Sequence, residues 1–352
     1  MKKKKKSLVK IISLVLLLGL IFIGLLGYDL YKKILKNNIE FGDGIEERYI
    51  FIESNSDFSD VIELLESYDL LLDVNSFKWV AEKKNYINNI KPGRYFIDRD
   101  MNNNDLVNLL RSGKQSPVKV TFNNVRSLKD VSSKLSQYLE ADSNQIYMSF
   151  IDNKFLSDNQ LNINNVISVF IPNTYEFYWN TSADDLRARM MREYKTFWNR
   201  ERRKKAAKLE LSYSEISTLA SIVEKEQNIR SDERPKIAGL YLNRIQQGMK
   251  LESDPTLIFA LQDFNINRVL NKDKKVDSPY NTYKFKGLPP GPICIPSINS
   301  IDAVLNFEKH DYIFMCAKED FSGYHNFATT YKQHLVNARK YQRMLNKKRI
   351  LR

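Results

Sequence analysis

An uncharged apolar run near the N-terminus constrains this chain more than any other feature. Residues 11–28 carry no charge and are rich in Leu, Ile and Gly. As a helix, a run of this length rises about 27 Å, which matches the hydrocarbon core of a bilayer. The lysines at 2–6 precede it, and dense positive charge marks the cytoplasmic side. We therefore predict a cytoplasmic N-terminus over residues 1–10 and a single-pass transmembrane anchor over residues 11–30.

A cleaved signal peptide is the alternative interpretation of this run. The apolar region of a signal peptide is usually shorter, and no small-x-small cleavage site precedes Asp29. We therefore expect an uncleaved anchor in the cell membrane, followed by a linker over residues 31–45. The remainder of the chain then lies on the extracytoplasmic side.

The composition fits an exported, folded body with an anionic partner. The chain has 352 residues, 43% of them hydrophobic, and a formal net charge of +13. Nucleic acid, anionic lipid and the carboxylate-rich cell wall are all compatible with this charge. The basic stretch from Ser182 to Lys208 is predicted to be one long amphipathic helix with a core-facing side. Because an exported chain rarely meets nucleic acid, we expect no nucleic-acid partner.

The sequence gives little indication of a metal site or of cysteine chemistry. The three histidines do not lie near a cysteine pair, so we expect no metal site and no cofactor. For Cys294 and Cys316 the sequence leaves two possibilities open, two unpaired residues or a disulfide, which is chemically permitted outside the cytoplasm.

The elements predicted after the linker describe an α+β fold in two domains. Residues 46–116 form a small module, and residues 117–352 a larger domain that holds the site. The predicted elements of the module are a strand at 48–52, helices at 59–68 and 77–84, a strand at 91–97 and a helix at 105–111 that ends at Gly113. Those of the larger domain include strands at 118–122 and 312–317, a helix at 127–140, short helices within a loop at 142–165, and a helix at 212–229.

The helix predicted at 212–229 contains the strongest catalytic candidate. Ser212 and Glu215 have the spacing of a capping box, which starts the helix. At about 100° per residue, Leu219 and Ile222 fall on the same face as Glu226, so the Glu226 carboxyl lies within the apolar stripe. Glu224 falls on the opposite, polar face, and we expect it to be solvated and ionised.

A carboxyl held against apolar neighbours resists ionisation, and its pKa rises. Such a group can donate a proton to a glycosidic oxygen. Glu226 is therefore the predicted catalytic acid. The alternative is that Glu226 is a buried carboxylate paired with Arg234 or Arg244, and helix geometry alone leaves both open.

Three Pro/Gly-rich segments are predicted to be cleft walls: 254–256, 278–283 and 287–292. The predicted substrate-binding residues are polar or aromatic and belong to these segments or to the segment after the last strand; they are Asp254, Tyr280, Asn281, Tyr283 and His325. Aromatic faces stack on sugar rings, and an amide both donates and accepts hydrogen bonds. Ordinary surface loops and a structural histidine are the alternatives.

Taken together, these segments resemble the MltG (YceG-like) family of endolytic murein transglycosylases. The resemblance spans essentially the whole chain and rests on ordered motifs at 91–97, 170–175, 219–226, 238–244, 248–256, 278–283, 287–292 and 325–327. This chain has Gln227 where the family usually has Thr, and Asn173 where it usually has Asp.

The resemblance implies a LysM-like module followed by a YceG-type catalytic domain, with the catalytic glutamate at position 226. It implies lytic cleavage without water, in which the bond between MurNAc and GlcNAc breaks and a 1,6-anhydro end forms. It also implies that nascent peptidoglycan glycan strands are the substrate, that cleavage terminates their elongation, and that the protein works beside peptidoglycan synthases of the elongation machinery. A hydrolase on the same scaffold and a non-enzymatic, membrane-anchored wall-binding protein remain the alternatives.

Overall fold

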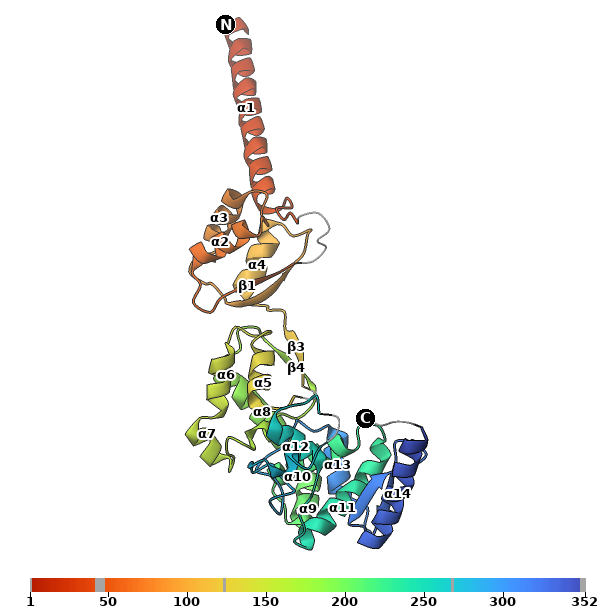
Figure 1. Cartoon of the computed structure of the whole chain (residues 1–352). Helices are drawn as coiled ribbons and strands as arrows, with labels where there is room; N and C mark the ends of the chain where they lie inside the picture. The colour runs from red at the N-terminus through yellow and green to blue at the C-terminus, as the bar shows by residue number, and fades with distance from the viewer. Residues whose placement is uncertain (1, 42–47, 123–124, 267–268, 349–352) are drawn as a thin grey trace. The chain divides into compact units, whose positions relative to one another are not determined.

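The computed structural model describes residues 2–41, 48–122, 125–266 and 269–348, and within them the chain divides into two units (Figure 1). The first unit comprises Met1–Val118 and Glu176–Thr181, and the second comprises Lys119–Tyr175 and Ser182–Arg352. Helices and strands occur in both units, so the fold is mixed, as predicted. The domain boundaries proposed from the sequence stay predictions.

Helix α1 (Lys2–Ile34) contains the predicted anchor. The segment Lys10–Ile34 has a mean hydropathy of 2.7, and no residue in its most apolar part is buried. The large apolar side chains of residues 14–26 are 50–68% exposed. Within the described part of the chain, α1 is the one helix long and apolar enough to cross a membrane.

The rest of the first unit is a small module built on a two-stranded sheet. Its elements are β1 (Arg48–Ile52), α2 (Phe58–Ser67), α3 (Val74–Lys83), β2 (Gly93–Ile97) and α4 (Asn103–Ser112). The strands are antiparallel, and Ile50 lies opposite Tyr95. Both side chains are fully buried with Leu65, Phe77 and Leu110. Helix α4 ends, as predicted, at Gly113, whose φ of 71° favours glycine.

The predicted linker, residues 31–45, lies partly in folded structure. Helix α1 continues to Ile34, and β-bridges join Asn37 to Asn102 and Ile39 to Leu71. Residues 42–45 lie outside the described residues.

A buried amide fixes the end of α1 to the module. The Asn103 side chain donates to the Lys33 carbonyl and to Ser76 Oγ, and it accepts from Asn38 Nδ2, each at 2.8 Å. The last turn of a helix has unpaired carbonyls, so Asn103 satisfies one of them while joining α1 to α3 and α4.

The second unit is mostly helical. Its strands include the antiparallel pair β5 (Phe314–Ala317) and β6 (His325–Ala328). The strands β3 (Val118–Thr121) and β4 (Thr174–Phe177) pair with each other, and the boundaries between the two units fall within them. The helices of the second unit are α5 (Leu128–Leu135), α6 (Ser143–Phe150), α7 (Asn153–Asp158), α8 (Ala183–Phe197), α9 (Arg200–Leu209), α10 (Tyr213–Glu226), α11 (Arg234–Gln246), α12 (Asp254–Leu261), α13 (Ile298–Leu305) and α14 (Tyr331–Lys347), with 3-10 turns η1 (Val166–Val169), η2 (Ser231–Glu233) and η3 (Asp273–Lys275). Cys294 and Cys316, whose pairing the sequence left open, are both free cysteines.

The single helix predicted from Ser182 to Lys208 is wrong, because the stretch forms α8 and α9. The chain leaves helical geometry at Trp198, where ψ is 62°, and Asn199 starts α9 by accepting a hydrogen bond from the Arg202 backbone N–H at 3.0 Å. The Trp198 ring is 1% exposed and stacks on Tyr213 with ring centroids 4.6 Å apart. Burial of this ring and the Asn cap together set the break.

Helix α10 is the central element of the second unit, and α11, α12 and α13 pack around it (Figure 1). Ser212 and Glu215 form the predicted capping box at its start. Every residue from Ile216 to Glu224 is buried, so the helix has no solvent-facing side over these residues. The helix, predicted to continue to residue 229, ends at Glu226, and Ile229 is 75% exposed.

Candidate active site

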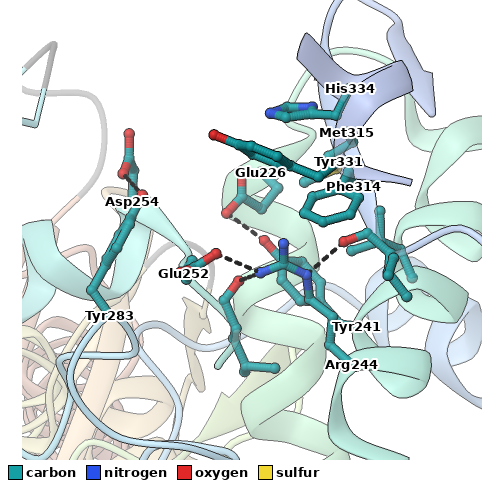
Figure 2. A pocket seen from close by; sticks show the side chains of 13 residues that line it. Glu226, Tyr241, Arg244, Glu252, Asp254, Tyr283, Phe314, Met315, Tyr331 and His334 are labelled. Carbon is teal, nitrogen blue, oxygen red and sulfur yellow. Dashed lines mark hydrogen bonds and ion pairs between the residues drawn. The ribbon is translucent and has the colours of Figure 1, made fainter. Parts of the chain in front are cut away.

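A pocket of about 300 Å³ lies at the C-terminal end of α10 (Figure 2). Its lining comes from α10, α11, the start of α12, the loop before α13, strand β5 and helix α14. Three of the predicted site residues line it: Glu226, Asp254 and Tyr283. Tyr280, Asn281 and His325 do not belong to the lining.

Glu226 is the last residue of α10 and is held by two hydroxyl groups. Tyr241 Oη donates to Glu226 Oε1 at 2.7 Å, and Ser253 Oγ donates to the same oxygen at 2.5 Å. Tyr241 is 2% exposed and Ser253 is 1% exposed, so both donors are fixed by packing. Because both hydrogen bonds end on Oε1, Oε2 is the oxygen available to carry a proton toward a ligand.

The surroundings of Glu226 favour its protonated form. Burial raises the pKa of the Glu226 carboxyl, the hydrogen bonds from Ser253 and Tyr241 oppose that rise, and the negative charge of Asp254 adds to it. The net direction is above the ordinary value for glutamate. The negative end of the α10 dipole acts in the same direction, since it disfavours a carboxylate in the last turn.

The ion-pair alternative for Glu226 does not describe this site. Arg244 pairs with Glu252 at 3.1 Å, and Arg234 donates to the Gln227 carbonyl, Ser297 and Asn299. In the part of the chain that the structure describes, neither arginine is paired with Glu226.

The turn that presents Ser253 is tied down by two buried threonines. The Ser253 backbone N–H donates to Thr282 Oγ1 at 3.0 Å, Thr256 Oγ1 donates to the Ser253 carbonyl at 2.7 Å, and the two threonine hydroxyls lie 2.8 Å apart. The Asp254–Thr256 segment, predicted to be an irregular cleft wall, instead begins α12, with Pro255 in the first turn, where proline is tolerated.

Asp254 and Tyr283 form a second polar group in the pocket. Tyr283 Oη donates to Asp254 Oδ1 at 2.6 Å. Figure 2 shows this pair on one side of the pocket and Phe314, Tyr331 and His334 on the other. The structure therefore places a second carboxylate in the same pocket as Glu226.

Asn281 holds its own loop together, and its predicted contact with substrate stays a prediction. Its side chain is fully buried, and Nδ2 donates to the carbonyls of Lys274 and Val276 at 3.0 and 2.8 Å. Its Oδ1 accepts from the Tyr283 backbone N–H at 3.0 Å, so the nitrogen and the oxygen of the amide are both hydrogen-bonded within the loop. Tyr280 packs against Phe259 with ring centroids 4.7 Å apart.

His325 belongs to a network beside α10. Its Nδ1 lies 2.7 Å from Glu233 Oε2, and its backbone N–H donates to Glu233 Oε1 at 2.8 Å. Gln227 Nε2 donates to Glu233 Oε2 and to the Gly323 carbonyl. Burial raises the pKa of Glu233, but the hydrogen bonds from His325 and Gln227 outweigh it, so the pKa lies below the ordinary value. The network fixes the turn after Glu226 to strand β6.

The prediction that Glu224 is solvated is wrong. Glu224 is 7% exposed, and its Oε2 accepts from the Ser297 backbone N–H at 2.7 Å and from Ser300 Oγ at 2.8 Å. These donors lie at the start of α13, so the carboxylate interacts with the positive end of that helix. The amphipathic reasoning failed because α10 is enclosed on all its faces.

Sequence reasoning missed several residues of the pocket. Tyr241, Arg244 and Ser253 lie within motifs that carry the family resemblance, but those motifs give no role to the individual residues. Tyr331 and His334 lie on a basic C-terminal helix that matches none of the quoted motifs, so no sequence signal pointed to them.

The fold places the Glu226 carboxyl at the end of a central helix, in the lining of a cavity of about 300 Å³ that Glu252 and Asp254 also line. The model of the YceG-like family matches residues 50–340. This chain therefore belongs to the YceG-like family.

Three known proteins are similar over most of this chain. An endolytic murein transglycosylase of Bacillus subtilis is 28% identical over 340 residues, which cover 92% of each chain. One from Streptococcus pneumoniae is 27% identical over 343 residues, covering 87% of this chain and 60% of that protein. The crystal structure of a YceG-like protein from Listeria monocytogenes has a TM-score of 0.53 and 27% identity, covering 83% of this chain and 98% of that one.

Proposed function

We propose that this chain is a peptidoglycan lytic transglycosylase that cleaves glycan strands internally, with Glu226 as its catalytic acid and base. The observation that carries the proposal is the enclosed Glu226 carboxyl, which has a raised pKa and two hydroxyl donors on one oxygen. The similarity to proteins named endolytic murein transglycosylases supports the same reaction.

In the first step, Glu226 Oε2 transfers its proton to the oxygen that links MurNAc to GlcNAc. The bond between MurNAc C1 and that oxygen breaks, GlcNAc leaves with a free hydroxyl, and positive charge develops at C1. Glu226 becomes a carboxylate, and the donors Tyr241 and Ser253 stabilise its negative charge without having to move.

In the second step, the Glu226 carboxylate removes the proton from the C6 hydroxyl of the same MurNAc. The C6 oxygen bonds to C1 and closes the 1,6-anhydro ring. The carboxyl is again protonated, so one group serves both steps and no water is consumed.

A hydrolase is the second candidate, and Asp254 is the observation that favours it. Ordinary glycosidases use a pair of carboxyl groups, one of which activates water or attacks C1. Asp254 lines the same pocket and accepts a hydrogen bond from Tyr283. In our proposal Asp254 and Tyr283 instead contact the sugar, while Tyr280, Asn281 and His325 support the walls around it.

We further propose that α1 anchors the chain in the cell membrane, with the N-terminus in the cytoplasm and the second unit outside. The apolar length of α1 supports the anchor, and the lysines at 2–6 support the orientation. The order β1-α2-α3-β2 supports a LysM-like module. An active site tethered near the membrane meets strands as they emerge, which fits termination of nascent strands beside peptidoglycan synthases.

The ends produced from purified sacculi test the reaction. The native chain is expected to release fragments with 1,6-anhydro-MurNAc ends, detected by mass spectrometry, and Glu226→Gln is expected to release none. New reducing ends would establish the hydrolase instead. No new ends from either chain would leave a wall-binding protein without enzymatic activity.

A further inference from the structure

One wall of the pocket is aromatic and has no part in the two chemical steps. It consists of Phe314 on β5 with Tyr331 and His334 on α14 (Figure 2). The Phe314 ring stacks on His334 with centroids 5.3 Å apart and an interplanar angle of 21°, and its centroid lies 5.8 Å from that of Tyr331. Phe314 and His334 are half-buried, whereas Tyr331 is 61% exposed.

The exposure of Tyr331 distinguishes it from the other two rings. A tyrosine at the rim of a pocket offers an apolar face and a polar hydroxyl, and its ordering on binding costs little entropy because it has few rotatable bonds. It is the first residue of α14, and Thr330 caps that helix by accepting from the Gln333 backbone N–H. The backbone that carries this exposed ring is therefore fixed.

Arg244 lies in the same part of the pocket and is held rigidly. Nε donates to the Ile313 carbonyl at 2.6 Å, and Nη1 donates to the carbonyls of Lys250 and Leu251 and to Glu252 Oε2. The Nη2 atom of Arg244 makes no hydrogen bond within the described residues. It is not a fully buried atom, and Arg244 lines the pocket. Arg244 is 6% exposed, and its guanidinium carbon lies 5.4 Å from the centre of the Phe314 ring, so its orientation at the pocket wall is fixed.

The charges of the pocket select the kind of group that Nη2 can bind. Glu252 lies 3.1 Å from Arg244 Nη1 and offsets the guanidinium charge, and Asp254 is a second acid in the lining. An anionic ligand group would be repelled by the carboxylates of Glu252 and Asp254. A neutral acceptor, such as an amide carbonyl, takes the hydrogen bond without that repulsion.

We propose that Tyr331 and Arg244 form a binding subsite for one N-acetylated sugar of the strand, next to the bond that Glu226 cleaves. The Tyr331 ring stacks on the pyranose, and Arg244 Nη2 donates to the acetamido carbonyl. The methyl of that group lies against Phe314. This inference rests on the proposed function, since it names the sugar recognised by that same site.

The stacking contact is tested with Tyr331→Ala in the full chain. Formation of 1,6-anhydro ends is measured against the concentration of uncrosslinked glycan strands. We expect KM to rise by about tenfold with kcat changed less than about twofold, because the contact is present before and during bond cleavage. Tyr331→Phe keeps the ring and is expected to retain the native KM. Tyr138→Ala, at a residue that is 38% exposed and outside the pocket, is the matched control.

The acetamido contact is tested without any substitution, since Arg244 also holds the fold. Native strands are compared with strands whose amino sugars have been N-deacetylated chemically. We expect kcat/KM of the native chain to fall about tenfold on the deacetylated strands. Equal kcat/KM on both substrates would overturn this contact, and a native KM in Tyr331→Ala would overturn the stacking.

Failure of the reaction and failure of the subsite are separated by a binding measurement. Glu226→Gln binds strands without cleaving them, and its affinity is compared with that of the double variant that also carries Tyr331→Ala. Loss of affinity in the double variant supports the subsite even if the native chain makes no anhydro ends, in which case the proposed reaction alone fails. Equal affinity of the two variants overturns the subsite, whatever ends the native chain produces.

Discussion

Glu224 and Glu226 are separated by one residue on α10, and their carboxyl groups have different partners. Glu224 accepts from Ser297 and Ser300 at the start of α13, while Glu226 accepts from Tyr241 and Ser253 at the pocket. Backbone and side-chain donors that stabilise a carboxylate make the first group structural. Burial and the position at the end of a helix raise the pKa of the second, which supports its proposed role as proton donor.

Replacing the two glutamates by glutamine is therefore expected to give opposite results. Glu224→Gln weakens the hydrogen bonds to α13 and costs about 1–3 kcal/mol of folding free energy, with kcat of the folded fraction unchanged. Glu226→Gln abolishes cleavage. Thermal unfolding and end-group analysis of the two purified variants check both effects, and cleavage by Glu226→Gln at the native rate would remove that residue from the mechanism.

The raised pKa of Glu226 also predicts how stability depends on pH. The folded state holds the proton more tightly than the unfolded state, so this contribution to stability is complete below the unfolded pKa and is lost as pH rises through the folded pKa. A glutamine at position 226 does not titrate, so the Glu226→Gln variant does not lose this stability as the pH rises. The unfolding free energy of Glu226→Gln, measured across this pH range, is expected to rise steadily relative to the native chain, and a constant difference would contradict the shift.

Tyr241→Phe removes one of the two donors on Glu226 Oε1 while keeping the buried ring. Because that hydrogen bond lowers the pKa of Glu226, its loss moves the alkaline limb of the kcat/KM profile to higher pH. The carboxylate formed in the first step also loses a donor, so kcat falls about 10- to 100-fold. A profile measured on glycan strands checks both, with Tyr138→Phe as the control.

At the scale of elements, the loop that precedes α13 depends on an amide rather than on regular structure. Asn281 joins Lys274, Val276 and Tyr283 within this loop. Since Tyr283 lines the pocket, the position of that wall depends on a residue that does not face it.

Asn281→Ala is accordingly expected to destabilise the second unit by about 2 kcal/mol, because two partly buried carbonyls lose their donors. The melting temperature falls, and the sensitivity of the loop to proteolysis rises. Asn299→Ala, which removes one partner of Arg234, serves as a comparison outside this loop. An unchanged melting temperature in Asn281→Ala would favour the original hypothesis of a direct sugar contact.

The elements differ in how far the sequence alone could predict them. The Ser212 capping box and the Gly113 helix end were predicted because local geometry determines both. The break at Trp198 was missed because it depends on burial of that ring against Tyr213. Glu226 was predicted from its apolar neighbours, whereas Tyr241, Ser253 and Tyr331 reach the pocket only through tertiary packing. The burial of Glu224 could not be predicted from one helix, since it depends on the helices around it.

At the scale of the whole molecule, the first unit contains the proposed anchor and the second contains the proposed active site. All residues of the proposed reaction lie between Glu226 and Tyr331, far along the sequence from α1. The proposed anchor therefore limits where the enzyme works and does not take part in cleavage.

Deletion of residues 2–29 is expected to move the chain from the membrane fraction to the soluble fraction. It removes the exposed apolar side chains but keeps Lys33 and Ile34, which contact the module. Cleavage of isolated sacculi should change less than about twofold, since no pocket residue is lost. Fractionation and end-group analysis check this, and a shortened chain that still sediments with membranes would show that another part of the protein binds them.

The Asn103 junction has a mechanical consequence. The Asn103 amide, on α4, donates hydrogen bonds to the Lys33 carbonyl at the end of α1 and to Ser76 on α3. If α1 spans the membrane as proposed, a flexible junction would let the module rotate freely above the lipid, whereas this hydrogen-bonded junction would transmit a tilt or rotation of α1 to the module. The orientation of the module would then depend on bilayer thickness, since a helix longer than the local hydrocarbon layer tilts to fit.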